Sequence, residues 1–204
     1  IYANKPSEGF PKEKKMRNNM EVIYGWSNKS VLYPFRLFRL IVSGGVDLVH
    51  IQHEYWLYGR GPRALLLPML MFMIRLSERK IILTLHGLLF LSSFDKSVLR
   101  YHKFHMPMIV VKAFALFYVN ILCGLSDAVI VHLRVMKKVL MEEYKVAPRK
   151  INVVEHGILD LPNSFRKAGK VSTILVYGSI RPAKGIEQVI EAFKEQKGRY
   201  PWLK

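Results

Sequence analysis

The fold is decided by the stretch Lys80-Ile81-Ile82-Leu83-Thr84-Leu85, which is followed directly by His86 and Gly87. The stretch is almost wholly apolar and shows no alternation between polar and apolar side chains. Continuous apolar runs of this length are typical of strands in parallel sheets, because helices cover both faces of such sheets. We therefore predict a central strand of an α/β fold, with polar residues at its carboxyl end.

Similar short apolar runs recur along the chain, with longer helical patterns between them. We predict strands at residues 21–24, 47–51, 80–85, 127–131, 151–154 and 172–177. We predict helices at residues 32–43, 62–78, 96–125 with a break near Pro107, 134–145 and 185–197. This alternation of strands and helices indicates an α/β fold with a doubly wound, mostly parallel sheet.

The domain organisation follows from a change in composition near residue 160. Residues 159–170 contain proline, glycine, asparagine and basic side chains, which is typical of a linker. We predict that residues 1–158 form one Rossmann-like domain and that residues 171–204 begin a second one with a single strand and helix. Because so short a segment cannot bury a core of its own, we expect the second domain to be truncated and the chain to be a fragment.

Composition and charge limit the classes of function. Half of the 204 residues are hydrophobic, which excludes intrinsic disorder, and the net charge of +17 indicates an acidic partner. That partner could be nucleic acid, an anionic membrane surface or a phosphorylated small molecule. Nucleic acid is disfavoured, because the basic residues are spread along the chain and most aromatic residues lie in apolar stretches. The single cysteine, Cys123, and the Lys-rich residues 1–30, which do not resemble a secretory signal, indicate a cytoplasmic protein.

Polar residues follow three of the predicted strands. In an open α/β sheet, ligands bind outside the carboxyl ends of the strands, so these ends should converge on one cleft. The candidate residues are His53, Glu54, His86, Gly87, His156 and Gly157. A structural role for any one of these histidines is the alternative.

Two further predictions concern the histidines. His50 lies within its apolar strand and is predicted to be a core residue. The histidines do not have the spacing of a zinc-binding helix, and there is no second cysteine to pair with Cys123, so we predict no metal site.

A second candidate site lies where the last predicted strand meets the last predicted helix. Its sequence is Tyr177-Gly178-Ser179-Ile180-Arg181-Pro182-Ala183-Lys184-Gly185. The free N–H groups and the dipole at a helix start favour an anion, and Arg181 and Lys184 add two positive charges. Gly178 allows a ligand to approach the backbone closely, so the segment suits a diphosphate. An ordinary strand-to-helix turn with two solvated cations is the alternative.

Two apolar stretches bear on membrane contact. The longest uncharged run, Ala113–Ser126, is shorter than the about 20 apolar residues that cross a membrane, which favours a buried or interfacial helix. A true span over Met106–Leu125, which would have to tolerate Lys112 and Asn120, is the alternative. Residues 65–74 are apolar and flanked by arginines, which suits an anionic membrane surface and a lipid-linked acceptor. A core helix with solvated basic ends is the alternative for this second stretch.

Five segments, taken in their order and spacing, resemble the retaining glycosyltransferase family of the GT-B fold, which is glycosyltransferase family 4-like (group 1). They are residues 47–54, 84–87, 126–132, 150–158 and 176–186. The resemblance implies transfer of a sugar from a nucleotide-sugar donor to a hydroxyl of a glycan or lipid-linked acceptor, in a cleft between two Rossmann-like domains. It implies no metal and no other cofactor.

The resemblance also implies roles for individual residues. Lys184 and Arg181 would stabilise the charge on the leaving diphosphate, and His86 would face the donor sugar. Gly178, Ser179, His156 and Gly157 would line the donor site. His53, Glu54 and Gly87 would lie on the acceptor side. Ser179 departs from the family pattern, in which many members have arginine at this position.

The resemblance implies further that the family's first strand and helix precede residue 1 and that its paired donor-binding glutamates follow residue 204. We therefore expect the chain alone to be inactive. We expect the parent enzyme to act in the cytoplasm, with peripheral contact to the cytoplasmic membrane face. The alternatives are a non-catalytic truncated remnant, a basic nucleic-acid-binding protein and a GT-B-type epimerase that would use Glu54 and Glu155.

Overall fold

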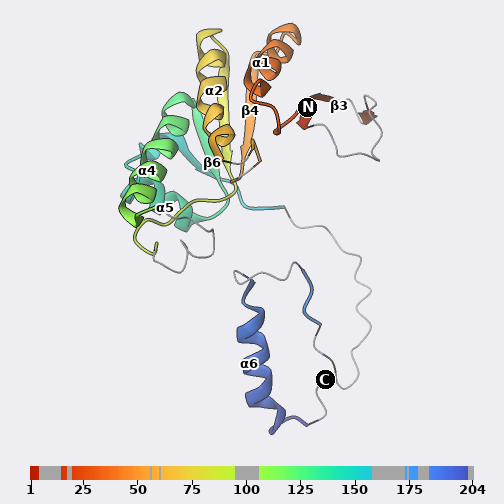
Figure 1. Cartoon of the computed structure of the whole chain (residues 1–204), viewed down its shortest axis with the longest axis vertical. Helices are drawn as coiled ribbons and strands as arrows, with labels where there is room; N and C mark the ends of the chain where they lie inside the picture. The colour runs from red at the N-terminus through yellow and green to blue at the C-terminus, as the bar shows by residue number, and fades with distance from the viewer. Residues whose placement is uncertain are drawn as a thin grey trace. The chain divides into compact units, whose positions relative to one another are not determined.

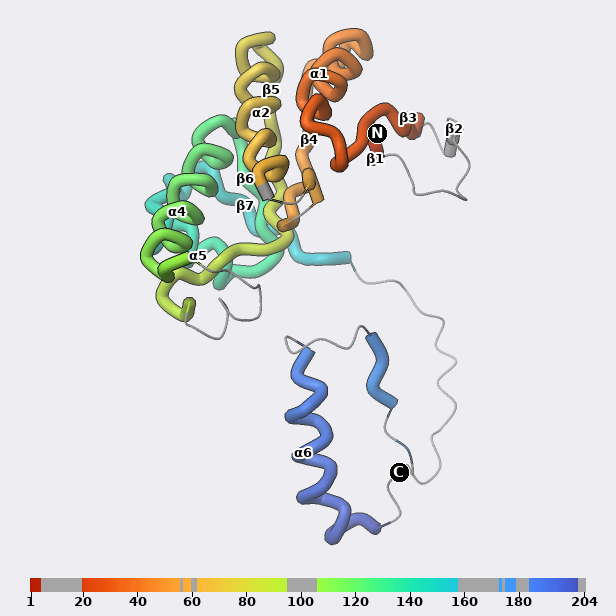
Figure 2. The backbone as a smooth tube through the Cα atoms, viewed as in Figure 1, coloured from red at the N-terminus to blue at the C-terminus, as the bar shows by residue number. Residues whose placement is uncertain are grey.

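The computed structural model describes residues 1–4, 15–17, 20–55, 57–59, 61–94, 106–157, 173, 175–178 and 184–201. The chain divides into two units, Ile1–Gly157 and Ile158–Lys204. Figure 1 shows the elements of each unit, and Figure 2 traces the backbone through them.

The first unit is built on a parallel sheet of four strands. These are β4 (Leu48–His53), β5 (Lys80–Leu85), β6 (Ala128–Val131) and β7 (Ile151–Val153), paired in the order β4-β5-β6-β7. Parallel neighbours need a crossover connection, and helices lie between successive strands along the chain. This arrangement confirms the α/β class and the parallel sheet predicted from the sequence.

A smaller sheet of three strands lies at the start of the same unit. Its strands are β1 (Tyr2–Asn4), β2 (Lys15–Arg17) and β3 (Met20–Trp26), in the order β1-β3-β2. β1 runs parallel to β3, and β2 runs antiparallel to it. The apolar run at residues 21–24 predicts β3, but no pattern in the sequence predicts its two partners, each of which is only three residues long.

The helices of the first unit are α1 (Tyr33–Ser43), α2 (Leu67–Leu76), α4 (Met108–Leu125) and α5 (Arg134–Glu142). Two 3₁₀-helices, η1 (Gly61–Leu66) and η2 (Pro148–Lys150), precede α2 and β7. The predicted helix at residues 62–78 is therefore a 3₁₀-helix followed by an α-helix. Pro68 has no N–H with which to bond the carbonyl of Ala64, so regular α-helical bonding begins after η1. Of the helix predicted at residues 96–125, residues 96–105 lie outside the described residues.

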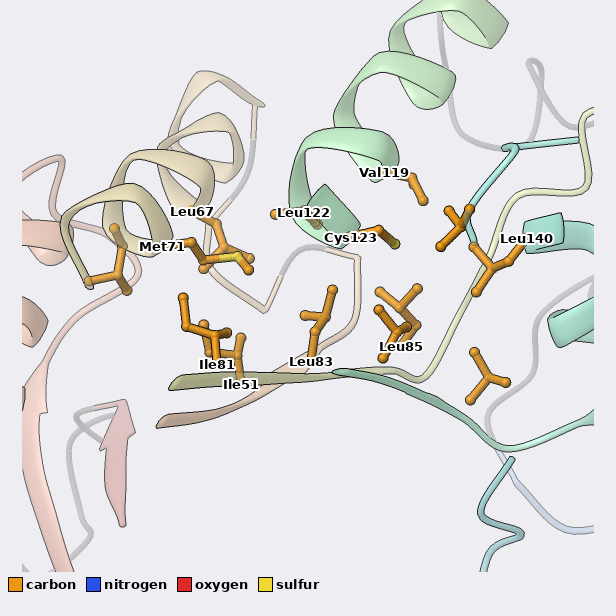
Figure 3. Close-up of a cluster of buried hydrophobic side chains, with 14 of the residues drawn as sticks. Ile51, Leu67, Met71, Ile81, Leu83, Leu85, Val119, Leu122, Cys123 and Leu140 are labelled. Carbon is orange, nitrogen blue, oxygen red and sulfur yellow. The ribbon is translucent and has the colours of Figure 1, made fainter. Parts of the chain in front are cut away.

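The core lies between α2, α4 and one face of the parallel sheet. Side chains alternate between the two faces of a strand, and alternate residues of β4, β5 and β6 are buried on this face, apart from the half-buried Val49. Figure 3 shows Ile51, Ile81, Leu83 and Leu85 pointing from the strands toward Leu67 and Met71 of α2 and Leu122 and Cys123 of α4. Because four residues of α2 are buried, the structure supports the core-helix alternative for the apolar stretch 65–74.

His50 is not the core residue that its apolar neighbours in the sequence predict. His50 is exposed, whereas His53 is only 4% exposed. The reason is the alternation of the strand, since Ile51 and His53 point toward the core and His50 and Gln52 point to the opposite face. An apolar neighbourhood in sequence therefore did not place His50 in the core.

The second unit contains α6 (Ile186–Lys197), close to the predicted helix. The prediction of a strand at residues 172–177 is wrong at the residues that the structure describes. Residues 173 and 175–177 are not in a strand, while residues 172 and 174 lie outside the described residues. Leu175 is 81% exposed and Tyr177 is 92% exposed. A strand needs neighbouring strands to bond its backbone and a covered face for its side chains, and the described residues of this unit offer neither.

Candidate active site at the carboxyl ends of the strands

The carboxyl ends of β5 and β6 place two histidines side by side. Leu85 of β5 pairs with Val131 of β6, and the next residues along the two parallel strands are His86 and His132. The backbone N–H of His86 also donates to the carbonyl of His53 at 2.9 Å, which ties this end of β5 to β4. Sheet register, rather than any local motif, brings these side chains together.

A row of hydrogen-bonded side chains runs across the sheet at this edge, on the face opposite the core. Thr84 Oγ1 lies 2.7 Å from His50 Nε2, and that nitrogen lies 3.1 Å from Gln52 Nε2. Gln52 Oε1 lies 2.7 Å from His86 Nε2. We call Thr84, His50, Gln52, His86 and His132 the polar row.

The polar row ends at His132. His86 Nδ1 lies 3.1 Å from His132 Nε2, and His132 Nδ1 lies 2.8 Å from the carbonyl oxygen of Val154. Val154 directly follows β7. The hydrogen bonds of the polar row, together with the bond from His132 to Val154, therefore connect all four strands of the sheet. Each ring is held by partners on neighbouring strands, which fixes its orientation.

His156 completes a cluster of three histidines. Its ring stacks on that of His132 with the centroids 3.7 Å apart and lies 6.0 Å from the ring of His86. One nitrogen from each of the three rings lies within 4.8 Å of the others. We call His86, His132 and His156 the histidine cluster.

The histidine cluster includes one residue that the candidate set lacked. His86 and His156 were predicted to lie at strand ends, whereas His132 was not singled out as a site residue. The signal was present, because His132 follows the apolar strand 128–131 just as His86 follows 80–85. Carbonyl and amide partners hold two of the three rings, and the cluster can bind an anion when protonated.

The histidine cluster also changes the acid–base behaviour of His86. Partial burial lowers the pKa of His86, and the neighbouring His132 lowers it further, while the carboxylate of Glu54 acts in the opposite direction. The net effect favours the neutral ring. A neutral imidazole can accept or donate a hydrogen bond to a sugar hydroxyl, as its tautomer requires.

His53 lies apart from the histidine cluster, on the core side of β4. Its ring packs near those of Tyr55 and Tyr118, with centroids 5.9 and 6.0 Å away. Burial, and then the charge of His86, lower the pKa of His53 to about 4. Its Nδ1 is buried and has no hydrogen-bond partner among the described residues. His53 is therefore neutral near pH 7.

An apolar cavity of about 420 Å³ lies beside His53. Its walls come from the end of β4, from η1 and from α4, and they are largely aromatic and aliphatic. They include Tyr55, Tyr58, Leu65, Phe94, Phe114 and Tyr118, and His53 and Glu54 add an imidazole and a carboxylate. The Tyr118 hydroxyl donates to the Ala64 carbonyl that Pro68 leaves free, at 2.9 Å, so this wall is fixed by a backbone partner.

The remaining predicted residues fall into two groups. Glu54 is exposed at the cavity, and Gly87 lies where an added Cβ would contact the Tyr55 ring at 3.6 Å. Gly157 is followed by the second unit. Gly178 and Lys184 lie in that second unit, whereas Ser179 and Arg181 lie outside the described residues.

The second unit has the backbone conformations at Gly178 and Gly185 that the predicted diphosphate site needs. Gly185 precedes α6 with φ +65°, a left-handed conformation that favours glycine. Gly178 has φ +130° and open space where a side chain would stand. These backbone features suit the close approach of a ligand, and Lys184 is exposed next to the helix start.

The first unit matches a family of known proteins. The family described as Glycosyltransferase Family 4 matches residues 2–159, which include the polar row, the histidine cluster and the apolar cavity. A search of curated proteins found no match.

Proposed function

The chain belongs to Glycosyltransferase Family 4, and on this basis we propose that the protein transfers a sugar from a nucleotide-sugar donor to an acceptor hydroxyl with retention of configuration. The observation that carries the proposal is the convergence of His86, His132 and His156 at the carboxyl edge of a parallel sheet. Ligands bind at this edge in open α/β sheets. The histidine cluster and the apolar cavity at His53 would provide polar and apolar surfaces for two different substrates.

The donor is assigned to the polar side of this edge and to the start of α6. In the proposed reaction, His86 hydrogen-bonds the donor sugar, and Gln52 fixes the orientation of its ring. His156 and Gly157 would line the same donor site. Lys184 and Arg181, with Gly178 and Ser179, would hold the diphosphate. Positive charges placed where negative charge develops on the leaving group lower the barrier, so this step needs no cofactor in our proposal.

The acceptor is assigned to the apolar cavity, which favours a lipid-linked substrate. The cavity walls offer aromatic and aliphatic contacts, while His53 and Glu54 mark its polar side. Burial of a hydrocarbon chain contributes about 0.8 kcal/mol for each CH₂ group, so a short acyl or prenyl segment would bind well there. A polysaccharide acceptor would find few hydrogen-bonding partners in these walls.

Helix α4 supports peripheral contact with the cytoplasmic face of a membrane. Among the described residues, α4 is the one helix long and apolar enough to cross a membrane by length and composition. Its inner face, however, packs in the core through Val111, Ala115, Val119, Leu122 and Cys123. Its outer face exposes Ile109 (76%) and Phe117 (64%). A helix with one face fixed on a sheet and an apolar outer face suits the membrane interface, and the +17 charge attracts anionic lipids.

The donor assignment is tested by removing the charge next to α6. Lys184→Ala should lower kcat by about 10²- to 10³-fold, as loss of one preorganised charge partner does. Lys194→Ala removes the same charge from an exposed position near the other end of α6 and should leave turnover within about twofold. Turnover would be followed as nucleotide release with a panel of nucleotide sugars.

Two outcomes would contradict the proposal. Equal turnover in Lys184→Ala and Lys194→Ala would show that the donor diphosphate binds elsewhere. No nucleotide-sugar binding by the wild-type protein, measured by calorimetry across the panel, would favour the non-catalytic remnant.

A further inference from the structure

The polar row has one end at which the direction of hydrogen bonding is fixed. The carbonyl oxygen of Val154 lies 2.8 Å from His132 Nδ1 and can only accept a hydrogen bond, so His132 donates from Nδ1. The peptide of Val154 is itself held at the end of the sheet, because its N–H donates to the carbonyl of Val131 at 2.9 Å. A neutral His132 ring therefore has its lone pair at Nε2.

This lone pair decides which nitrogen of His86 carries the proton. His132 Nε2 lies 3.1 Å from His86 Nδ1, so in the neutral pair His86 Nδ1 donates and His132 Nε2 accepts. With its proton on Nδ1, the neutral His86 ring has its lone pair at Nε2. That nitrogen faces Gln52 of the neighbouring strand β4.

The rest of the polar row can adapt to either arrangement of the His86 proton. Gln52 Oε1 lies 2.7 Å from His86 Nε2, a contact that suits a proton on this nitrogen. A half-turn of the amide brings its NH₂ group to the same position and suits a lone pair instead. His50 can hold its proton on either nitrogen, and the Thr84 hydroxyl can donate or accept, so both can follow the amide. Gln52 thus orients the His86 ring without choosing its tautomer.

We propose that His132 is the positioning residue of the candidate donor site, and that it holds the proton of His86 on Nδ1 so that the lone pair at Nε2 accepts a hydrogen bond from a hydroxyl of the donor sugar. The inference rests on the proposed function, in which His86 contacts that sugar. The hydroxyl would replace the Gln52 amide at Nε2. His86 is exposed and His132 is half-buried, which fits a ligand-binding ring supported by a second ring.

The groups around His86 set the pH range in which its ring is neutral. Partial burial lowers the pKa of His86, and the neighbouring His132 lowers it further. The carboxylate of Glu54 acts in the opposite direction, and His156 and His50 add smaller decreases. Because the net shift is downward from the ordinary value near 6.5, the His86 ring is neutral at pH 8.

The test is NMR of the ring nitrogens of the full chain at pH 8, by long-range proton–nitrogen correlation. We expect His86 to carry its proton on Nδ1 and its lone pair on Nε2. His132→Phe keeps a ring but removes the acceptor, so the proton of His86 should move to Nε2, where Gln52 Oε1 accepts it. His132→Gln offers a carbonyl near the position of the lost Nε2 and should keep the proton on Nδ1.

Two further variants are controls for this measurement. His156→Phe preserves a ring that stacks on His132, where the centroids lie 3.7 Å apart, but it has no nitrogen, so the tautomer of His86 should not change. Gln52→Leu removes the amide and should also leave the proton on Nδ1, because His132 remains. Circular dichroism verifies that each variant folds.

Donor binding supplies a second readout, which general loss of structure would not reproduce. Calorimetry should show that His132→Phe binds a nucleotide sugar about 10-fold more weakly than the wild type, as loss of one hydrogen bond does. The same variant should bind the corresponding nucleoside diphosphate with unchanged affinity, because the sugar is absent. His132→Gln should recover most of the loss.

Two NMR results would overturn the role of His132. One is a wild-type His86 with its proton on Nε2, and the other is a proton that stays on Nδ1 in His132→Phe. A wild-type chain with the expected tautomer that binds no nucleotide sugar would instead contradict the proposed function, and with it the donor role of His86. The two failures are therefore distinguishable.

Discussion

His53 differs from the other strand-end histidines because its ring lies on the core side of β4, between tyrosines. Its pKa of about 4 is below the ordinary value for histidine, so the folded state favours the neutral ring. The unfolded chain takes up the proton near pH 6.5. The stabilisation is therefore present above pH 6.5 and is lost as the pH falls toward 4.

The His53→Leu variant tests this assignment. Between pH 7 and pH 4.5, the free energy of unfolding of the wild type should fall by about 2 kcal/mol more than that of His53→Leu, which has no ring to protonate. Urea unfolding at the two pH values measures the difference. His50→Leu, at an exposed position of the same strand, should follow the wild type. Parallel pH dependence in wild type and His53→Leu would refute the buried neutral ring.

At the scale of elements, Asp127 joins three parts of the first unit. Its carboxylate accepts hydrogen bonds from Arg75 of α2 and from the backbone N–H of Ile81 in β5, both at 2.9 Å, and it directly precedes β6. Partial burial raises the pKa of Asp127, but the Ile81 N–H and the Arg75 guanidinium outweigh it and hold the pKa below its usual value. This stabilisation is present above the ordinary pKa of aspartate and is lost as the pH falls below it.

Asp127→Ala should lower the free energy of unfolding at pH 7 by about 1–3 kcal/mol, because it leaves Ile81 and Arg75 without their acceptor. The comparison variant is Glu142→Ala, which breaks the exposed pair with Lys138 at 3.9 Å. Exposed pairs of this kind contribute about 0.5 kcal/mol or less. Chemical denaturation measures both variants, and losses of equal size would show that Asp127 does not connect these elements.

At the scale of the whole molecule, the proposed membrane contact joins the outer face of α4 with the net charge of +17. Phe117→Ser removes an exposed aromatic ring from α4 and should reduce binding to phosphatidylserine-containing vesicles several-fold, as measured by sedimentation. Phe35→Ser makes the same change on α1, where Phe35 is 49% exposed, and should have little effect. Anionic lipids should matter most at low salt.

If the wild-type chain remains in the supernatant with anionic vesicles at low salt, the proposed membrane contact is wrong. Equal loss of binding in Phe117→Ser and Phe35→Ser would instead show that general hydrophobicity, and not the α4 face, governs the interaction.

Prediction from sequence succeeded where the signal is local. The strand at Lys80–Leu85 was predicted at its observed bounds because every residue needed for the pattern lies within six positions. The prediction of a strand at residues 172–177 was wrong at the described residues, because a strand also needs neighbouring strands, and a local pattern does not show whether these are present. His50 was wrongly assigned to the core because the apolar run does not show which alternate residues meet the helices.

The sequence by itself determined the α/β class, the parallel strands and the polar character of the strand ends, since hydrophobic periodicity and strand-end residues are properties of short segments. The tertiary structure decided which polar ends meet. The pairing of Leu85 with Val131 puts His86 beside His132, and the turn after β7 brings His156 onto them. These contacts join residues that are at least 22 positions apart in the sequence, which is the separation of His132 and Val154. Such contacts depend on the order and register of the strands.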